Sequence, residues 1–214
     1  MVTAAPQEMY LAQARDSLNA EDCMKIYDKW AASYNAEVGD EAQNYVAPVL
    51  VAQVALKSTT TPKDSVILDA GCGTGLVGQA LAMEGAKIID GMDLSVPMLN
   101  IARQANVYRN LEQCDLTKRI QSPDQTYDII TCVGTFTRGH VGPDPALREF
   151  VRITKKNGVI VATILEEIWV AQGFKTEVEK MAAEGIVNVV AQELVDYVKG
   201  HGDKAILLVL ERQI

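Results

Sequence analysis

The chain has 214 residues, of which 48% are hydrophobic and 22% charged, and its formal net charge is −8. This length and composition predict a single globular domain with enough apolar side chains for a full core. The acidic balance disfavours nucleic acid as a partner, because it repels phosphate backbones. No stretch approaches the roughly 20 apolar residues of a membrane span, so we expect no membrane insertion.

The cysteines are widely spaced and form no Cys-x-x-Cys pair. They are Cys23, Cys72, Cys114 and Cys132. This spacing predicts free thiols in a reducing compartment, and with only two histidines it predicts no metal site. Residues 1–7 lack the basic and apolar regions of a signal peptide. We therefore expect a cytoplasmic location.

Residues 7–34 are expected to be helical, because apolar residues recur at spacings of three and four. Tyr27 and Tyr34 are two helical turns apart, so a continuous helix places them on one face, with Trp30 between them in the sequence. An aromatic stripe that packs a core explains this spacing as well as a ligand contact does.

Residues 41–57 predict a second helix, which a short polar loop containing Pro62 separates from the strand expected at 66–68. The loop is too short for a domain linker. We therefore expect one domain over residues 1–214, with an N-terminal helical cap or lid at residues 1–57 and a cofactor-binding core at residues 64–214.

The strongest local signal is a strand, a glycine-rich loop and a helix in succession. Residues 66–68 predict a short buried strand that Asp69 ends, and residues 76–84 predict the helix. Glycines alternate between them, at Gly71, Gly73 and Gly75. Glycines let a ligand approach the backbone, and the first turn of a helix offers unpaired N–H groups. This unit therefore predicts a nucleotide-like ligand.

Two ligand classes are compatible with these glycines. Gly73, Gly75 and Gly78 satisfy the dinucleotide fingerprint G-x-G-x-x-G. The second class is a ligand that carries positive charge. Asp69 favours this class, because a carboxylate beside the loop attracts a positive charge and repels the pyrophosphate of a dinucleotide. A glycine-rich turn without a ligand is the third interpretation.

Acidic residues also follow the next two predicted strands. Residues 86–92 end at Asp93, where an acid commonly binds ribose hydroxyls, although a helix N-cap is the alternative. Ser95 and Pro97 then open a helix in which Met98 contacts an adenine ring or only packs. A third strand, residues 108–113, leads to Asp115, which is either an adenine ligand or a solvated loop acid.

The remaining elements continue the alternation of strands and helices. Residues 128–133 predict a strong strand, and its loop at 134–141 should face the reacting group, since ligands lie beyond the carboxyl ends of strands. The later elements are expected as a helix at 143–154, a strand at 159–165, a helix at 168–184 and a final strand pair at 188–199 and 205–212. Such alternation indicates a mainly parallel α/β sheet.

The run Asp69-Ala-Gly71-Cys-Gly73-Thr-Gly75, followed by Asp93 and Asp115, resembles class I S-adenosylmethionine-dependent methyltransferases over roughly residues 24–165. The run Tyr27-Asp-Lys-Trp30-Ala resembles the Y-D-x-W-A motif of the small Williams–Beuren syndrome region methyltransferase-like proteins; Asn35 departs mildly from that pattern. The resemblance implies a Rossmann-like, mainly parallel seven-stranded sheet with helices on both faces and an antiparallel last strand.

The same resemblance implies S-adenosyl-L-methionine as cofactor. It assigns cofactor contacts to Tyr27, Trp30, Tyr34, Asp69, Gly71, Cys72, Gly73, Gly75, Asp93, Leu94, Met98, Asp115, Leu116 and Val133. The expected reaction is methyl transfer to oxygen or nitrogen of a small organic molecule, which requires alignment of the acceptor more than acid–base chemistry.

Acceptor contacts are expected from the loop after residue 133, at Thr135, Phe136, Arg138 and His140. His140 is the candidate base, because histidine titrates near neutral pH; a structural hydrogen bond is the alternative. Arg138 is either a partner for an acceptor carboxylate or a solvated charge. A second hypothesis is a cofactor-binding protein that has lost methyl transfer and serves regulation or cyclisation. A dinucleotide oxidoreductase is disfavoured by Asp69 and by the lack of Tyr-x-x-x-Lys.

Overall fold

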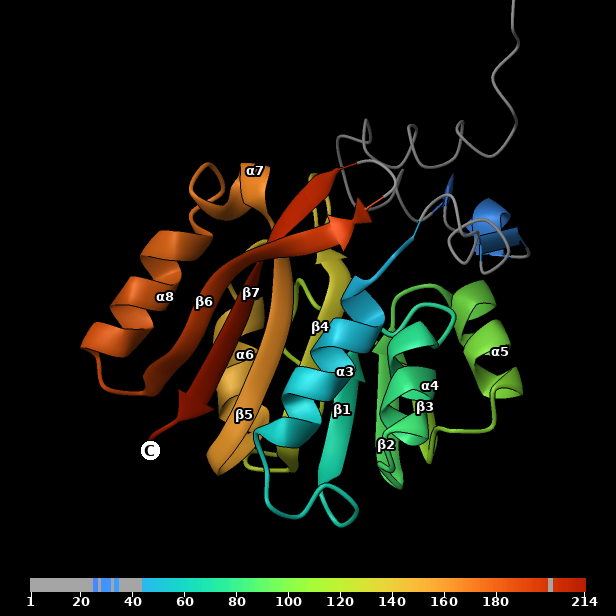
Figure 1. Ribbon diagram of the computed structural model, residues 1–214, viewed down its shortest axis with the longest axis horizontal. Helices are drawn as coiled ribbons and strands as arrows, with labels where there is room; N and C mark the ends of the chain where they lie inside the picture. Colours follow the sequence, from blue (N-terminus) through green and yellow to red (C-terminus); the bar gives the residue numbers. More distant parts are fainter. Residues whose placement is uncertain (1–24, 27, 32, 35–43, 200–201) are drawn as a thin grey trace, which may run out of the picture.

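The computed structural model describes residues 25–26, 28–31, 33–34, 44–199 and 202–214. Its strands form one seven-stranded sheet in the order β3-β2-β1-β4-β5-β7-β6 (Figure 1). The strands are β1 Val66–Ala70, β2 Ile88–Asp93, β3 Asn110–Gln113, β4 Tyr127–Phe136, β5 Thr154–Leu165, β6 Val187–Val198 and β7 Asp203–Arg212. The first five strands pair in parallel. β7 is antiparallel to both of its neighbours, which confirms the predicted fold class.

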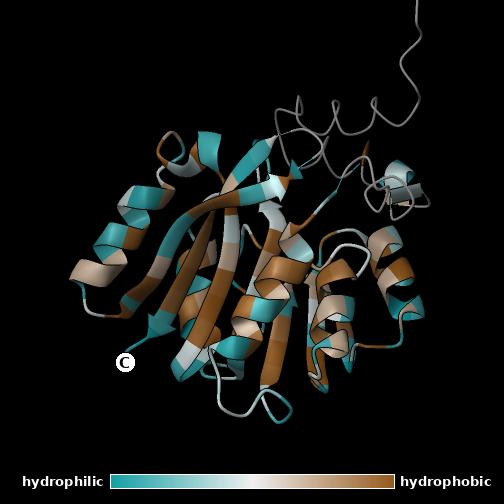
Figure 2. Ribbon diagram, in the orientation of Figure 1, coloured by the Kyte–Doolittle hydropathy of each residue, from teal (hydrophilic) through white to brown (hydrophobic). Residues whose placement is uncertain are grey.

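Helices cover both faces of the sheet. They are α3 Ala47–Lys57, α4 Leu76–Met83, α5 Val96–Gln104, α6 Ala146–Ile153, α7 Glu166–Trp169 and α8 Phe174–Ala183. Side chains of α3 and α4 share one apolar cluster with Ile67, whereas those of α6, α7 and α8 share another with Leu68. Neighbouring strand residues point to opposite faces, so β1 supplies both clusters. Figure 2 shows the result, with apolar central strands and helices that are polar on their outer side.

Residue types explain how two of these helices begin. Ser95 caps α5, because its hydroxyl accepts a hydrogen bond from the Met98 N–H at 3.4 Å, and Pro97 lies in the first turn. Gly75 precedes α4 in the left-handed conformation, with φ of +93°, which a side chain would disfavour. The predicted bounds of α4, 76–84, and the predicted start of α5 agree with the structure to within two residues.

The predicted helix at 41–57 begins later than expected. Residues 41–43 lie outside the described residues, Tyr45 forms an isolated β-bridge with Val198, and α3 starts at Ala47. The Val46 N–H donates to the Tyr197 carbonyl at 3.3 Å. The chain before Pro48 is therefore held against β6, a long-range pairing that helix periodicity does not reveal.

Two predictions further along the chain also need correction. β5 begins at Thr154 rather than 159, and residues 155–158 are an irregular part of that strand, where Lys155 Nζ lies 2.9 Å from both carboxylate oxygens of Asp128. The single helix expected at 168–184 is two helices, α7 and α8. Gly173, with φ of +83°, ends the break between them.

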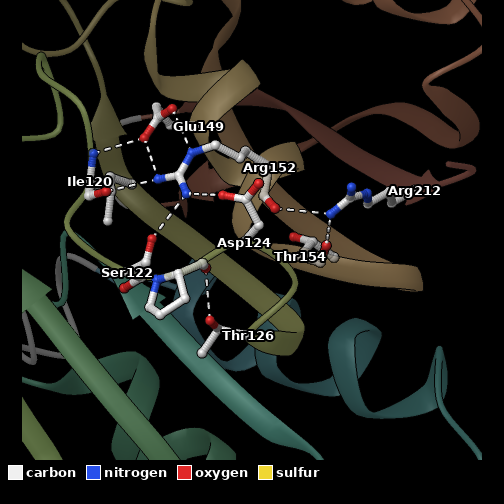
Figure 3. Close-up of polar contacts among 9 residues, drawn as sticks. Ile120, Ser122, Asp124, Thr126, Glu149, Arg152, Thr154 and Arg212 are labelled. Carbon is white, nitrogen blue, oxygen red and sulfur yellow. Dashed lines mark hydrogen bonds and ion pairs between the residues drawn. The ribbon is translucent and has the colours of Figure 1, made fainter.

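A charged cluster ties the loop before β4 to α6, at the sheet edge where β4 and β5 begin (Figure 3). The Arg152 guanidinium donates to Glu149 and Asp124 and to the carbonyls of Ile120 and Ser122. Glu149 in turn accepts the Ile120 N–H at 2.8 Å. The Arg152 and Glu149 side chains are only 16% and 12% exposed, so this pair is largely desolvated.

Replacing Arg152 with alanine is therefore expected to lower the free energy of unfolding by about 3 kcal/mol, because Glu149 would remain buried without its cation. Denaturant unfolding of the full chain measures this change. Lys175→Ala is the matched control: its ion pair with Glu179 is exposed and 3.8 Å long, so its loss should change stability by less than about 0.5 kcal/mol. Equal stability of the two variants would contradict a structural role for the cluster.

Candidate active site

The carboxyl ends of β1, β2 and β4 and the loop after β3 surround one cavity. Most of the predicted cofactor residues line it, namely Tyr34, Gly71, Cys72, Gly73, Asp93, Leu94, Met98, Asp115, Leu116 and Val133. Two predicted acceptor residues, Thr135 and His140, line the same cavity. The topology therefore brings together residues from four separate loops. They meet at the carboxyl ends of the strands, where ligands bind in open α/β sheets.

The glycine loop after β1 is fixed to the end of β2. The N–H groups of Gly71 and Cys72 both donate to the Met92 carbonyl, at 2.7 and 2.9 Å. Gly71 has φ of +72°, and an added Cβ would lie 1.9 Å from Thr135 Oγ1. An added Cβ at Gly73 would meet no atom within 4 Å. Gly71 is thus needed for packing against the β4 loop, whereas Gly73 leaves open space beside the backbone.

Asp93 joins the glycine loop to α5. Its carboxylate accepts the N–H of Gly73 and the N–H of Ser95, each at 2.8 Å. Burial raises the pKa of Asp93, and these backbone hydrogen bonds oppose that rise. A carboxylate can accept about four hydrogen bonds. Asp93 therefore keeps the capacity to accept ribose hydroxyls from the cavity.

Asp115 lines the cavity from the loop after β3. One carboxylate oxygen accepts the N–H and the hydroxyl of Thr117, and the other pairs with Lys118 at 2.9 Å. Partial burial raises the pKa of Asp115, but the hydrogen bonds from Thr117 and Lys118 outweigh it, so the pKa lies below its usual range. Asp115 is thus an ionised acceptor at neutral pH, next to the apolar Leu116.

Asp69 does not line the cavity. It is fully buried under the glycine loop, where the Tyr108 hydroxyl donates to its carboxylate at 2.6 Å. Burial raises the pKa of Asp69 to about 7, although Tyr108 and Thr131 donate hydrogen bonds that lower it. The Tyr108 ring occupies space that side chains at Gly78 and Gly91 would fill. Asp69 therefore supports the loop from below, and Gly75 likewise lies outside the lining.

The residues expected to contact the acceptor divide into two groups. Phe136 is fully buried in the core, with ring centroids 6.0 Å from Phe150 and 5.0 Å from Phe174. Arg138 is an exposed side chain that lies 3.4 Å from Glu167. Neither lines the cavity, so only Thr135 and His140 keep the positions expected of acceptor contacts.

His140 lies in the loop after β4 and is held by that loop. Its Nδ1 is 2.8 Å from the Thr137 hydroxyl, and its backbone N–H donates to the Thr137 carbonyl at 3.3 Å. Burial lowers the pKa of His140 to about 4. The imidazole is therefore neutral at pH 7 and brings no charge to the cavity that it lines.

The N-terminal segment reaches the cavity through Tyr34. The described residues between 25 and 34 are helical, and the buried Trp30 packs edge-on against Tyr34 with ring centroids 4.7 Å apart. Trp30 is thus behind Tyr34 rather than in the lining. Asp28 accepts a hydrogen bond from the Ser95 hydroxyl, which attaches this segment to α5. Tyr27 lies outside the described residues.

Several lining residues were missed by sequence reasoning, above all Tyr45, Thr74 and Gly134. The Tyr45 hydroxyl donates to the Tyr197 hydroxyl at 3.1 Å, although the residues are 152 positions apart. No local pattern pairs them. Tyr108, which lies behind the lining at Asp69, was also missed, although the sequence carried a signal for it. Gly78 lies within a helix and Gly91 within a strand, and glycines in such places often mark the close approach of another side chain.

The cavity suits a ligand that combines hydrogen-bond donors with an apolar surface. Asp93 and Asp115 provide acceptors at separate points, and Met98 and Leu116 provide apolar surface. The open backbone at Gly73 gives room for direct contact. Among the described residues, no group of three or more His, Cys, Asp or Glu is placed to hold a metal ion. Within the same part of the chain, no helix is long and apolar enough to cross a membrane.

Comparison with known proteins gives concordant results. Residues 67–158 match the family model described as a methyltransferase domain. Methyltransferase-like protein 27 of Homo sapiens is 34% identical over 142 residues, which are 65% of this chain and 56% of that protein. Malonyl-[acyl-carrier protein] O-methyltransferase of Yersinia pestis is 37% identical over 103 residues, 48% of this chain and 37% of that protein.

A solved structure resembles most of the chain. The crystal structure of the [4+2]-cyclase SpnF has a TM-score of 0.69 to this structure at 16% sequence identity. The likeness covers 92% of this chain and 97% of the SpnF chain. At this identity the likeness concerns the fold alone. The chain spans about half or less of the length of the two curated relatives. Residues 67–158 are thus similar to a methyltransferase domain, the strand order is that of the Rossmann-like methyltransferase fold, and the cofactor that this family implies is S-adenosyl-L-methionine.

Proposed function

We propose that the protein transfers a methyl group from S-adenosyl-L-methionine to oxygen or nitrogen of a small organic molecule. One observation carries the proposal: Asp93 lies in the cavity lining, fixed by hydrogen bonds from Gly73 and Ser95, and His140 belongs to the same lining. In this proposal, a carboxylate that binds the ribose of the cofactor and a side chain that faces the methyl acceptor share one cavity. The relatives' names support the same chemistry, because one of them is an O-methyltransferase.

In this proposal the cofactor supplies an activated methyl group on its sulfonium, and the protein aligns the acceptor for an in-line displacement. Asp93 accepts the ribose hydroxyls and Asp115 the adenine amino group. Tyr34 covers the cavity from the N-terminal segment and helps to exclude water. His140, neutral at pH 7, accepts a hydrogen bond from the acceptor and takes up its proton when the acceptor is protonated.

Further features of the chain fit this proposal. The Y-D-x-W-A run at residues 27–31 favours a likeness to the small Williams–Beuren syndrome region methyltransferase-like proteins. Of the predicted cap at residues 1–57, we infer that the segment carrying Tyr34 covers the cofactor, since Tyr34 lines the cavity, whereas α3 at residues 47–57 packs on the sheet. Cys72, Cys114 and Cys132 are free thiols, which supports a reducing, cytoplasmic compartment. The net charge of −8 favours a small acceptor over nucleic acid.

The alternative is a domain that binds the cofactor but transfers no methyl group. The likeness to a cyclase structure is a reason to test it, since one fold hosts several chemistries. Labelled S-adenosylmethionine incubated with the protein and a metabolite extract separates the two. A labelled small-molecule product supports transfer, whereas cofactor binding without any labelled product favours the alternative. Labelled RNA or protein with no small-molecule product would contradict the proposed acceptor class.

Asp93→Ala is expected to weaken S-adenosylhomocysteine binding by about 1–3 kcal/mol, because it removes the ribose acceptor. Isothermal titration calorimetry measures the change. Asp64→Ala is the control, since Asp64 is an exposed acid in the loop before β1, at the far edge of the sheet. Affinity equal to that of the unaltered protein would place the ribose elsewhere.

A further inference from the structure

Tyr108 lies in a slot that three glycines leave open beneath the glycine loop. An added Cβ would lie 3.1 Å from the Tyr108 ring at Gly75, 2.2 Å from the Tyr108 hydroxyl at Gly78 and 3.0 Å from the ring at Gly91. These glycines belong to the glycine loop, to α4 and to β2. The ring therefore reaches the underside of the loop only because three side chains are absent there.

This slot brings the Tyr108 hydroxyl to Asp69. The hydroxyl donates to the Asp69 carboxylate at 2.6 Å, and the Thr131 hydroxyl lies 3.4 Å from the same carboxylate. Burial raises the pKa of Tyr108 well above its usual value, so the phenol keeps its proton and remains a donor. Asp69 is fully buried, so solvent does not screen this hydrogen bond.

No cation of the described residues interacts with Asp69. The titratable groups that do so are Tyr108 before β3, Cys72 in the glycine loop, Cys132 on β4 and Asp93 at the end of β2. The helix α4 contains no titratable residue, Arg103 of α5 is exposed, and Arg109 pairs with Asp90. The ionised form of Asp69 therefore depends on neutral hydrogen-bond donors, and Tyr108 gives the shortest of the two side-chain hydrogen bonds.

We propose that Tyr108 is a positioning residue for the cofactor, because its hydroxyl favours the ionised form of Asp69, whose negative charge under the glycine loop attracts the methyl donor. S-adenosyl-L-methionine carries a sulfonium and an ammonium, and a buried negative charge acts on them with little screening. Gly71, Cys72 and Gly73 follow Asp69 closely in the chain and line the cavity. This role rests on the cofactor binding that the proposed function requires, and not on which acceptor is methylated.

The pH dependence of S-adenosylmethionine affinity tests this role, by calorimetry between about pH 6 and about pH 9. Burial raises the pKa of Asp69 to about 7, and the hydrogen bond from Tyr108 opposes that rise. Tyr108→Phe keeps the ring and removes the donor, so Asp69 should titrate about one pH unit higher. Affinity at pH 7 should then fall about fivefold, and the loss should shrink toward about pH 9, where both proteins hold an ionised Asp69.

Two further variants and a control accompany this measurement. Gly78→Ala suits a helix, but its Cβ would lie 2.2 Å from the Tyr108 hydroxyl and displace it, so the pH profile should shift in the same direction. Asp69→Asn should lose the part of the profile that belongs to this carboxylate. Tyr127→Phe is the matched control, because it changes a buried tyrosine at the amino end of β4, and it should leave the profile unchanged.

An equal loss of affinity at every pH in Tyr108→Phe would mean that Tyr108 only supports the fold, and would overturn the proposal. An unchanged profile would do the same. Should Tyr108→Phe fail to fold, Gly78→Ala decides by the same profile. Carbon-13 NMR of aspartate carboxyls in the ligand-free chain keeps the two proposals apart. If S-adenosylmethionine binds at no pH, the proposed function fails, and the NMR titration still decides whether Tyr108 controls the ionisation of Asp69.

Discussion

Gly71→Ala is expected to weaken S-adenosylhomocysteine binding by about 100-fold or more. Gly71 has φ of +72°, which costs a residue with a side chain about 1–2 kcal/mol. The new Cβ would also lie 1.9 Å from Thr135 Oγ1, so the loop or the end of β4 must move, at a further cost of about 1–3 kcal/mol. The displaced loop carries the N–H groups that bind Met92 and Asp93. Calorimetry on the purified variant measures the loss.

Gly173→Ala separates the two contributions. Gly173 also has a positive φ, of +83°, but an added Cβ there meets no atom within 4 Å, and the residue lies before α8, outside the cavity lining. This variant should lose only the conformational part, seen as a small fall in thermal stability, with unchanged S-adenosylhomocysteine affinity. Retention of affinity by Gly71→Ala to within about threefold would show that the contact with Thr135 is readily relieved.

The predictions that hold best rest on local signals. The strand, glycine loop and helix at residues 66–84 could be predicted because each part has a short-range cause: an apolar run, positive φ at glycine and an amphipathic helix. Asp93 and Asp115 could be placed near one another because strand ends meet at the same edge of a parallel sheet. Both acids do line one cavity. Topology thus converts local predictions into a site.

The predictions that fail depend on which way a side chain points. Phe136 was expected at the acceptor, but the strand extends to that residue, and its ring turns into the core beside Phe150. Neighbouring residues on a strand point to opposite faces of the sheet. When the predicted strand ends a few residues too early, the orientation of the side chains that follow is therefore mispredicted. Thr135 and Phe136 illustrate this, since one lines the cavity and the other is buried in the core.

Other features depend on tertiary contacts that no single sequence reveals. Asp69 was expected to face the ligand, yet Tyr108 reaches it from the connection between α5 and β3 and holds it under the loop. The Tyr45–Tyr197 pair joins the segment before α3 to β6. Both contacts span long sequence separations, and both surround the site. The chemistry of the site was thus more predictable than the side chains that support it.

His140→Gln is expected to lower the rate of methyl transfer by about 10²–10³-fold, if the acceptor holds its proton near neutral pH. Glutamine at this position of the lining still has a group that can hydrogen-bond to Thr137, but it cannot take up a proton. The measurement is turnover of labelled S-adenosylmethionine into small-molecule product, with calorimetry to verify that S-adenosylhomocysteine affinity holds. Arg138→Gln, an exposed change in the same loop, is the matched control and should retain turnover.

The pH dependence gives this prediction a second readout. A base must be deprotonated to act, and burial lowers the pKa of His140 to about 4. The unaltered enzyme should therefore keep its turnover constant as the pH falls from about 8 to about 6, and lose it only as the pH approaches about 4, where the imidazole gains a proton. A fall in turnover centred near the ordinary histidine pKa of about 6.5 would mean that the imidazole is solvated during turnover. Full turnover by His140→Gln at every pH would reduce the role of the protein to alignment of the acceptor with the methyl group.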